Sequence, residues 1–424
     1  MMDDEECENP VKRRNRQQLS NAMEHMRFAV TYDPKLSSTS PTPPTPPPLD
    51  SLSLSEQDAY GVPASLQPLR HPPERSGDPS NQLKRTDPFQ FGSRYLQEGD
   101  DIFAFNAWDH VETDAAYAEF AELQYAKQRE APVSDFDRKR FNQDPAKWWN
   151  KFYGSNSANF FKNRKWLQQE FPVLKEVTKK GAGRKVLLEV GAGAGNTAFP
   201  ILRENENEEL RVHACDFSKK AVEVMKKSEH YDEKIMQANV WDVAGTGESA
   251  LPPGLEPGSV DVVLMIFIFS ALAPNQWDQA LKNIFSVLKP GGQVLFRDYG
   301  RGDLSQIRFK KERWMQENFY IRGDGTRVYF FDKDELGDIW KGKTFQPPTE
   351  EPEDRTVFEE KEPRESNGVV EDSISHTTTP AFDIEDIGID RRMLVNRQRR
   401  LKMYRVWLQA VFRKPSQESQ STNS

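Results

Sequence analysis

Apolar runs of strand length alternate with amphipathic stretches from Arg184 to Tyr299. Strands that alternate with helices are typical of a parallel sheet covered on both faces, so the pattern predicts an α/β fold. We expect Lys289, Pro290 and the two glycines after them to end the last helix. The predicted strands are KVLLEVG, RVHACDF, KIMQANV, VDVVLMIF and QVLFRDY, and the predicted helices are NTAFPILREN, SKKAVEVMKKSE and NQWDQALKNIFSVL.

Helices and strands are also predicted on either side of this alternating region. Ala115 to Gln128 has the spacing of an amphipathic helix, and a second helical segment runs from about Pro145 to Phe171, with aromatic side chains among Lys and Arg. After the fifth strand, Asp383 to Asn396 and Lys402 to Arg413 alternate in character and predict a terminal strand pair.

Composition limits how much of the 424 residues can form a core. Only 36% of the residues are hydrophobic and 29 are prolines, many of them in the Pro- and Ser-rich stretch 34–80. Such a stretch cannot bury enough apolar surface to offset chain entropy, so we predict a disordered arm there. We assign no structure to 1–33 and expect order to begin near Asp87. The predicted divisions are a helical, aromatic-rich region at 81–170, an α/β domain at 171–414 with an acidic insert at 342–378, and a disordered tail at 415–424.

Charge is distributed unevenly along the chain. The net charge is -8, yet Arg391 to Lys414 contains nine Lys or Arg and no acidic residue. A basic patch on an acidic chain can still attract phosphates. The alternative is that these side chains line the solvated edge of a hairpin.

The spacing of the cysteines and the lengths of the apolar runs indicate the cellular compartment. Cys7 and Cys215 lie far apart, which excludes a disulfide framework and gives none of the paired spacing of a structural zinc site. The longest apolar run, Val260 to Leu272, is too short to cross a bilayer, and the acidic N-terminus does not resemble a signal peptide. We therefore expect no metal and a reducing, cytoplasmic location.

The strongest chemical signal is a glycine turn after the first predicted strand, which reads Glu189-Val-Gly191-Ala-Gly193-Ala-Gly195 and leads into a helix. Glycines let the backbone approach a ligand closely, and the helix start offers unpaired N–H groups. A dinucleotide fingerprint would need a third glycine at 196 or 198, where this chain has Asn and Ala, which makes a pyrophosphate ligand less favoured. The acidic residue two before the first glycine resembles the first motif of class I methyltransferases, which bind S-adenosylmethionine.

Four further residues at predicted strand ends extend this candidate cofactor site. Asp216 ends the second strand, where a carboxylate can accept hydrogen bonds from both ribose hydroxyls. Asn239 and Asp242 follow the third strand, where contacts to an adenine ring are expected. Ile266 on the fourth strand can pack against the adenine face, or it can be core alone.

An arginine, an acid and a tyrosine end the fifth strand at Arg297-Asp298-Tyr299. Burying such charges costs free energy unless they are paired or face a ligand. We therefore consider two readings: an internal contact between Arg297 and Asp298, or a catalytic group around the methyl acceptor. The segment from Glu317 to Phe331 adds arginine and aromatic side chains suited to phosphate contacts and base stacking.

Together these segments resemble one family, the eukaryotic tRNA N3-methylcytidine methyltransferases, and most closely a fungal member. The resemblance runs from about Asp87 to Lys414, without the acidic insert. It rests on the segments FGSRYL, NAWDHV, WWNKFY, NFFKNRKWL, LLEVGAGAGN, ACDFS, MIFIFSALAP, LKPGGQVLFRDYG, RFKK, NFYIRGDGTRVYFF, VNR and KMYRVWLQ.

The resemblance implies a Rossmann-like, mostly parallel seven-stranded sheet with an antiparallel last strand, preceded by a region that grips the tRNA anticodon stem and loop. It implies that Trp149 and Tyr153 reach the cofactor. It leaves open whether Asn239 or Asp242 contacts adenine. The implied reaction moves a methyl group from S-adenosylmethionine to N3 of a cytidine at position 32 of the anticodon loop.

Our mechanistic hypothesis is that Asp298 stabilises the cation that develops on the base, while Arg297 and Tyr299 hold loop phosphate or base edges. An aminoacyl-tRNA synthetase or another RNA-binding protein is a further candidate partner. Two other classes remain open: a methyltransferase acting on protein or a small molecule, and a non-catalytic RNA-binding protein that retains the fold.

Overall fold

The computed structural model describes residue 96 and residues 99–156, 160–164, 166–343, 379–396 and 401–416. The expectations for 1–33, for the arm at 34–80, for all but the first two residues of the insert and for the tail after residue 416 lie outside the described residues. No described helix is both long enough and apolar enough to cross a lipid bilayer.

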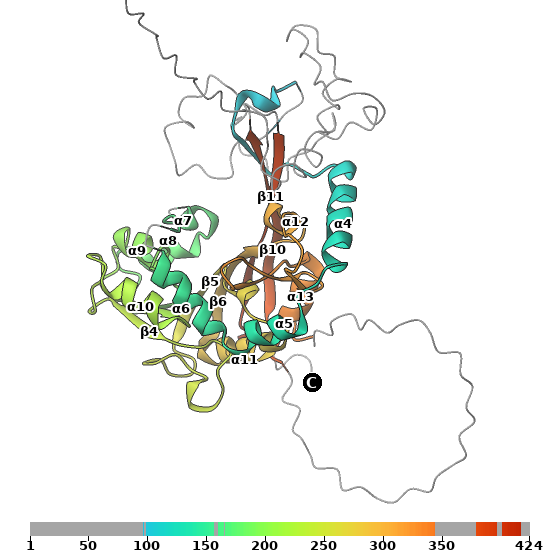
Figure 1. The fold of residues 1–424 in the computed structure, drawn as a ribbon. Coiled ribbons are helices and arrows are strands. Elements are labelled where there is room, and N and C mark those ends of the chain that lie inside the picture. The colour runs from blue at the N-terminus through green and yellow to red at the C-terminus, as the bar shows by residue number, and fades with distance from the viewer. Residues whose placement is uncertain are drawn as a thin grey trace, which may run out of the picture.

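Five parallel strands form one side of the main sheet, as the alternating pattern predicts (Figure 1). They lie in the spatial order β6, β5, β2, β3 and β4. The chain therefore builds outward from β2 to β4 and then returns to the other side of β2, where it adds β5 and β6. In chain order they are β2 (Lys185–Val190), β3 (Leu210–Asp216), β4 (Met236–Val240), β5 (Val260–Ile266) and β6 (Leu288–Tyr299). Ligands of open parallel sheets bind at the carboxyl edge near such a reversal.

The other side of the sheet is built from two long strands that follow in the sequence and one short strand that precedes the parallel set. β11 (Leu401–Arg413) runs antiparallel to β6, β10 (Asp383–Asn396) runs antiparallel to β11, and β1 (Ala107–Asp109) pairs with β10. The predicted terminal pair and the antiparallel last strand are therefore confirmed. The sheet has eight strands where seven were expected, because β1 comes from the region expected to be helical and adds to the edge.

Helices cover both faces of the sheet, and the alternation of side chains along β2 shows the division. Leu188 faces a core made with α11 (Trp277–Val287) and α13 (Lys333–Trp340). Leu187 faces the opposite core, to which four short helices contribute. These are α7 (Leu167–Glu170), α8 (Val173–Thr178), α9 (Ala198–Arg203) and α10 (Lys219–Lys226).

Short elements complete the fold. A second, three-stranded sheet consists of β7 (Trp314–Gln316), β8 (Phe319–Ile321) and β9 (Arg327–Tyr329), and α12 (Leu304–Ile307) precedes it. The 3-10 turns are η3 (Ile102–Ala104), η4 (Gly247–Ser249), η5 (Phe269–Ala271) and η6 (Pro274–Gln276). The glycines at 291 and 292 do not end a helix as expected, because β6 already begins at Leu288.

Three described helices precede α7 in the sequence. α4 (Ala115–Arg129) begins where the Asp114 carboxylate accepts the Tyr117 N–H at 2.7 Å, and it packs with β1 on the projecting end of β10 and β11. α5 (Asp135–Gln143) and α6 (Pro145–Ser155) follow. The second predicted helix is thus shorter than expected, because α6 ends at Ser155 and the next helix begins only at Leu167.

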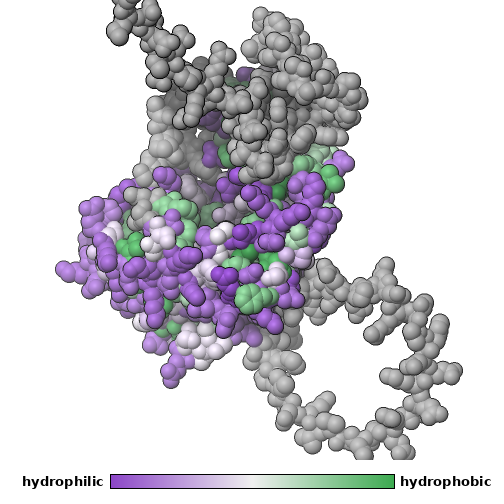
Figure 2. Space-filling model, in the orientation of Figure 1, coloured by the Kyte–Doolittle hydropathy of each residue, from purple (hydrophilic) through white to green (hydrophobic). Residues whose placement is uncertain are grey.

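The face seen in Figure 2 is mainly hydrophilic, with small apolar patches.

Candidate functional site

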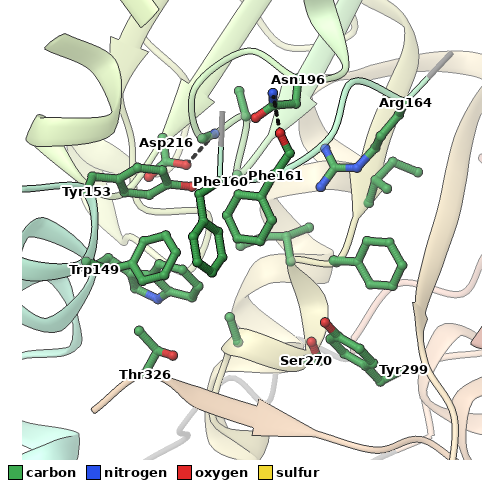
Figure 3. A pocket seen from close by; sticks show the side chains of 18 of the residues that line it. Trp149, Tyr153, Phe160, Phe161, Arg164, Asn196, Asp216, Ser270, Tyr299 and Thr326 are labelled. Atoms are coloured by element: carbon green, nitrogen blue, oxygen red, sulfur yellow. Dashed lines mark hydrogen bonds between the residues drawn. The ribbon is translucent and has the colours of Figure 1, made fainter. Parts of the chain in front are cut away.

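A cavity of about 480 Å³ opens at the carboxyl edge of the parallel strands. Residues that follow β2, β3, β5 and β6 line it, and side chains from α6, from the turn between β8 and β9 and from β11 close it (Figure 3). This is the edge at which the sequence placed the candidate cofactor residues. The cavity brings together six of them, together with the candidate catalytic residue Tyr299. The six are Trp149, Tyr153, Gly191, Gly193, Asp216 and Ile266.

The glycine turn is bare because its surroundings leave no room for side chains. Gly191 and Gly193 both have positive φ, at 66° and 58°. A Cβ on Gly193 would lie 2.4 Å from the Tyr153 hydroxyl, and one on Gly191 would lie 2.8 Å from Ile268. The backbone of this turn therefore forms part of the cavity wall.

Asp216 is fixed beside the glycine turn by two backbone donors. Its Oδ2 accepts the Gly193 N–H at 2.8 Å and its Oδ1 accepts the Ser218 N–H at 2.8 Å, at the start of α10. Burial raises its pKa to about 6, and the two N–H donors oppose that rise. A buried carboxylate in this position can accept further hydrogen bonds from ligand hydroxyls in the cavity.

Glu189 and Gly195 lie behind the turn, and the cavity lining does not include them. The Glu189 carboxylate accepts the Ala198 N–H at 3.1 Å at the start of α9 and lies 3.9 Å from the Arg164 guanidinium. Burial raises its pKa to about 7, although Arg164 lowers it. Gly195 packs closely against Phe199. Both residues therefore shape the turn instead of forming the wall.

Aromatic side chains of α6 face the turn across the cavity. Trp149 and Tyr153, one helical turn apart, are stacked with ring centroids 6.2 Å apart. Phe160 and Phe161 approach the same side, and Figure 3 shows all four rings around the cavity. On the strand side, Ile266 is buried at the end of β5 and contributes to the lining.

Asn239 and Asp242 lie outside the cavity lining. Asn239 is half-buried in β4, and the lining of the cavity includes neither of these two described residues. Asp242 lines a neighbouring pocket, which shares Phe217 with the main cavity. Which of the two contacts adenine stays a prediction.

Asp298 lies directly beneath the far half of the cavity. Its carboxylate accepts the Ser270 N–H at 2.9 Å and the Tyr299 N–H at 2.8 Å, and both of those residues line the cavity. Asp298 itself is fully buried and does not. Burial raises its pKa to about 6, opposed by hydrogen bonds from Ser270.

Arg297 points away from the cavity, so the expectation that it holds loop phosphate needs correction. The guanidinium is buried and donates hydrogen bonds to Asp390 and Gln409. The partner of Arg297 is thus a carboxylate on β10, whereas the internal contact considered from the sequence was with Asp298. Successive residues of a strand point to opposite faces, which separates Arg297 from Asp298.

Several lining residues were missed. Segments quoted for the family resemblance contain nearly all of them, but no pattern in those segments distinguishes the side chains that point into a cavity. Phe267 has a positive φ of 61°, an uncommon conformation for a bulky residue that often marks a functional site. The missed lining residues include Phe160, Phe161, Arg164, Trp166, Phe267, Ser270, Arg322, Asp324, Thr326, Arg405 and Trp407.

Comparison with known proteins agrees with this geometry. Residues 188–294 match a family described as "Methyltransferase domain". The chain is 44% identical to the tRNA N(3)-methylcytidine methyltransferase of Schizosaccharomyces pombe, over 76% of this chain and 92% of that protein. It is 37% identical to a Drosophila melanogaster protein with the same description, over 82% and 95% of the two chains.

Two further matches are partial. The chain is 48% identical to the "tRNA(Thr) (cytosine(32)-N(3))-methyltransferase" of Saccharomyces cerevisiae over 81% of its own length, but it spans only about half, 48%, of that relative. Among solved structures, phosphoethanolamine N-methyltransferase 2 of Haemonchus contortus in complex with S-adenosyl-L-methionine is 15% identical, with a TM-score of 0.35, over 67% of this chain and 61% of that one.

Proposed function

The chain belongs to the tRNA N(3)-methylcytidine methyltransferase family, and on this premise we propose that it transfers a methyl group to N3 of a cytidine in the tRNA anticodon loop, at position 32. One observation supports this most directly. A single cavity joins a bare glycine turn and a buried carboxylate at one end to aromatic and arginine side chains at the other. The first end suits a nucleoside-containing cofactor and the second suits an unpaired nucleotide.

The methyl donor is S-adenosylmethionine, which supplies the methyl group from its sulfonium when bound. The donor set of the cavity fits this cofactor. Asp216 is placed to accept hydrogen bonds from ribose hydroxyls, Ile266 and Trp149 offer apolar surface to an adenine ring, and the turn at Gly191 and Gly193 gives the ligand direct access to backbone. We assign the adenine edge to Asn239 or Asp242, and we favour Asp242 because its pocket adjoins the cavity through Phe217.

Methylation of the acceptor base does not require the protein to transfer a proton. Neutral cytosine has a lone pair at N3, so no general base is needed, and the base gains a positive charge as the new bond forms. The ionised Asp298, beneath Ser270 and Tyr299, places a fixed negative charge close to that position. Since N3 lies on the pairing edge, the target must be unpaired or flipped out, which an anticodon loop provides.

A direct test combines the purified chain, S-adenosylmethionine and tRNA transcripts, with nucleosides analysed by mass spectrometry. We expect N3-methylcytidine at position 32 and none when that cytidine is replaced by uridine. Transfer to a protein or small molecule, with salt-insensitive binding of tRNA, would favour the alternative methyltransferase class. No transfer and no cofactor binding would leave a non-catalytic RNA-binding protein.

Partners and location extend the same proposal. We include assistance by an aminoacyl-tRNA synthetase or another RNA-binding protein, which pull-down from cells with and without ribonuclease would test. A cytoplasmic location accords with the buried free thiol of Cys215, which suits a reducing compartment.

A further inference from the structure

Arginine and aromatic side chains alternate along the far half of the cavity. The Arg297 guanidinium lies between two indoles, 4.9 Å from the ring centroids of both Trp166 and Trp407. The Arg405 guanidinium also lies close to Trp407, 5.1 Å from that ring. The series continues through Tyr299, which has Arg405 at 6.0 Å and Arg322 at 5.5 Å from its centroid. We call this series the arginine–aromatic ladder: Trp166, Arg297, Trp407, Arg405, Tyr299 and Arg322.

Only one member of the ladder is withdrawn from the cavity. Arg297 is buried, whereas the five other members are half-buried and line the cavity. Arg297 therefore contacts the aromatic rings from a position that a ligand cannot reach. Arg405 and Arg322 are partly exposed on the side that a ligand can reach.

The buried member is anchored to three segments that lie far apart in the sequence. Asp390 on β10 pairs with Arg297 and lies 3.1 Å from His110, just after β1. Burial alone would raise the pKa of Asp390, but the hydrogen bond from His110 and the charge of Arg297 lower it well below its usual range. Gln409 accepts from Arg297 and donates to Glu170 of α7 at 2.9 Å. This network ties the ladder to the edge of the sheet where the N-terminal region packs.

Arg405, the next arginine of the ladder, is held in place by an ion pair but remains partly exposed. The Arg405 Nε donates to the buried carboxylate of Asp303 at 2.8 Å, and the Arg405 side chain remains 29% exposed. Asp303 also accepts the Val406 N–H at 2.9 Å, so it fixes both the backbone and the guanidinium of this part of β11.

We propose that the arginine–aromatic ladder is the subsite for the unpaired strand that carries the methyl acceptor. Trp407 and Tyr299 stack on bases, Arg405 and Arg322 contact phosphates, and Arg297 is a positioning residue that sets the two indoles. This inference rests on the proposed function and deepens it. Alternating rings and guanidinium groups match single-stranded nucleic acid, because every base offers a flat face and every linkage carries a negative charge. A small apolar substrate would offer no negative charge to the partly exposed guanidinium groups of Arg405 and Arg322.

The experiment measures methyl transfer to an anticodon stem-loop RNA with an unpaired cytidine. For Trp407→Leu we expect the KM for RNA to rise between roughly fivefold and a hundredfold, as expected for the loss of one base stack. Trp407→Phe keeps a ring and should restore most of the wild-type KM. The affinity for S-adenosylmethionine, measured by calorimetry, should stay within about twofold in both variants and shows that they fold.

The salt dependence of RNA binding separates the two kinds of arginine. Arg405→Met removes a phosphate contact, so the slope of log affinity against log salt should become shallower by about 0.7 to 0.9. Arg297→Lys keeps the charge but loses the flat guanidinium, so the KM for RNA should rise roughly threefold to thirtyfold with an unchanged slope. The matched control is Arg413→Lys, which alters another arginine paired with a carboxylate of β10, Glu385, at the opposite end of the strand. It should behave as wild type.

The outcomes distinguish this inference from the proposed function. If the wild-type chain methylates no RNA, the proposed function fails and the inference falls with it. If the wild-type chain methylates RNA but Trp407→Leu and Arg297→Lys leave the KM for RNA unchanged, only the ladder is rejected. A shallower salt slope in Arg297→Met, which removes the charge that Arg297→Lys keeps, would show that this residue contacts phosphate directly and would overturn its assignment as a positioning residue.

Discussion

The two halves of the cavity are built in different ways. The half with the glycine turn uses mainly the ends of β2, β3 and β5, between Gly191 and Ile266, and α6 adds Trp149 and Tyr153. The far half uses side chains that are widely separated in the chain, from Trp166 to Trp407. The first half depends on backbone geometry, and the second depends on how separate elements pack together.

This difference has a consequence for mutation. In the turn half, carboxylates receive backbone N–H groups, so a substitution there disturbs the main chain and the ligand contact together. In the far half, Asp298 and Asp324 also accept backbone N–H groups, but the ligand-facing side chains of the ladder do not hold the main chain of the turn, so substitutions of Trp407 or Arg405 should leave cofactor binding unchanged. Separate measurements of cofactor affinity and RNA affinity can test whether the halves are as independent as this implies.

The largest effect is expected for Asp216→Ala. The change removes the ribose acceptor and leaves the N–H groups of Gly193 and Ser218 without their partner, so the affinity for S-adenosylmethionine should fall roughly a hundredfold or more. Calorimetry measures this affinity, and RNA affinity should be unchanged. The matched control is Asp324→Ala in the far half, which also removes an acceptor for a backbone N–H, that of Thr326 at 2.9 Å, and should leave cofactor affinity intact.

The next largest effect is expected for Asp298→Asn. The amide has nearly the same size but no charge, and its NH2 cannot accept one of the two N–H groups that Ser270 and Tyr299 donate. Stabilisation of the developing cation is lost, so kcat should fall about tenfold or more. Single-turnover assays with saturating RNA and cofactor measure the chemical step. Unchanged KM for RNA and unchanged cofactor affinity would locate the defect in that step, whereas wild-type turnover would remove Asp298 from the mechanism.

The pH dependence of kcat gives a related test. The pKa of Asp298 is raised to about 6, so the carboxylate is ionised above that pH and becomes protonated below it. We expect kcat at saturating cofactor to fall roughly tenfold from pH 7 to pH 5, in proportion to the ionised fraction. Saturation is needed because the pKa of Asp216 is also about 6 and its protonation should weaken cofactor binding. The same fall in Asp298→Asn would assign the titration to another group.

The smallest effect is expected for Arg164→Lys, which tests the boundary between the halves. The Arg164 guanidinium donates to the Thr197 hydroxyl at 2.6 Å and lies 5.8 Å from the centre of the Phe267 ring. Lysine cannot reproduce this planar arrangement, so cofactor affinity should weaken roughly threefold to tenfold, with little change in the KM for RNA. The control Arg211→Lys changes an exposed arginine of β3 that donates to the Leu210 carbonyl and should have no effect. A larger loss of RNA affinity than of cofactor affinity would place Arg164 in the acceptor half.

Much of the fold could be predicted because the strands are long apolar runs bounded by clear turns. The five parallel strands and the terminal pair were identified, whereas β1 was missed because a strand of three residues carries no periodic signal. The helix after Pro145 was drawn too long because its aromatic residues continue beyond the point where the helix ends. The roles of Glu189 and Arg297 depended on side-chain direction, which a sequence pattern does not give.

The sequence alone determined the α/β fold, the glycine turn at Gly191 and Gly193, and the position of Asp216. These follow from local chemistry, since apolar alternation, glycine and a strand-end acid act through their immediate neighbours and the carboxyl ends of parallel strands meet at one edge. Tertiary structure alone decided that Arg297 turns inward to Asp390 while Tyr299 faces the cavity. The free energy of burying a guanidinium depends on the carboxylate and the rings around it, and those come from distant parts of the chain.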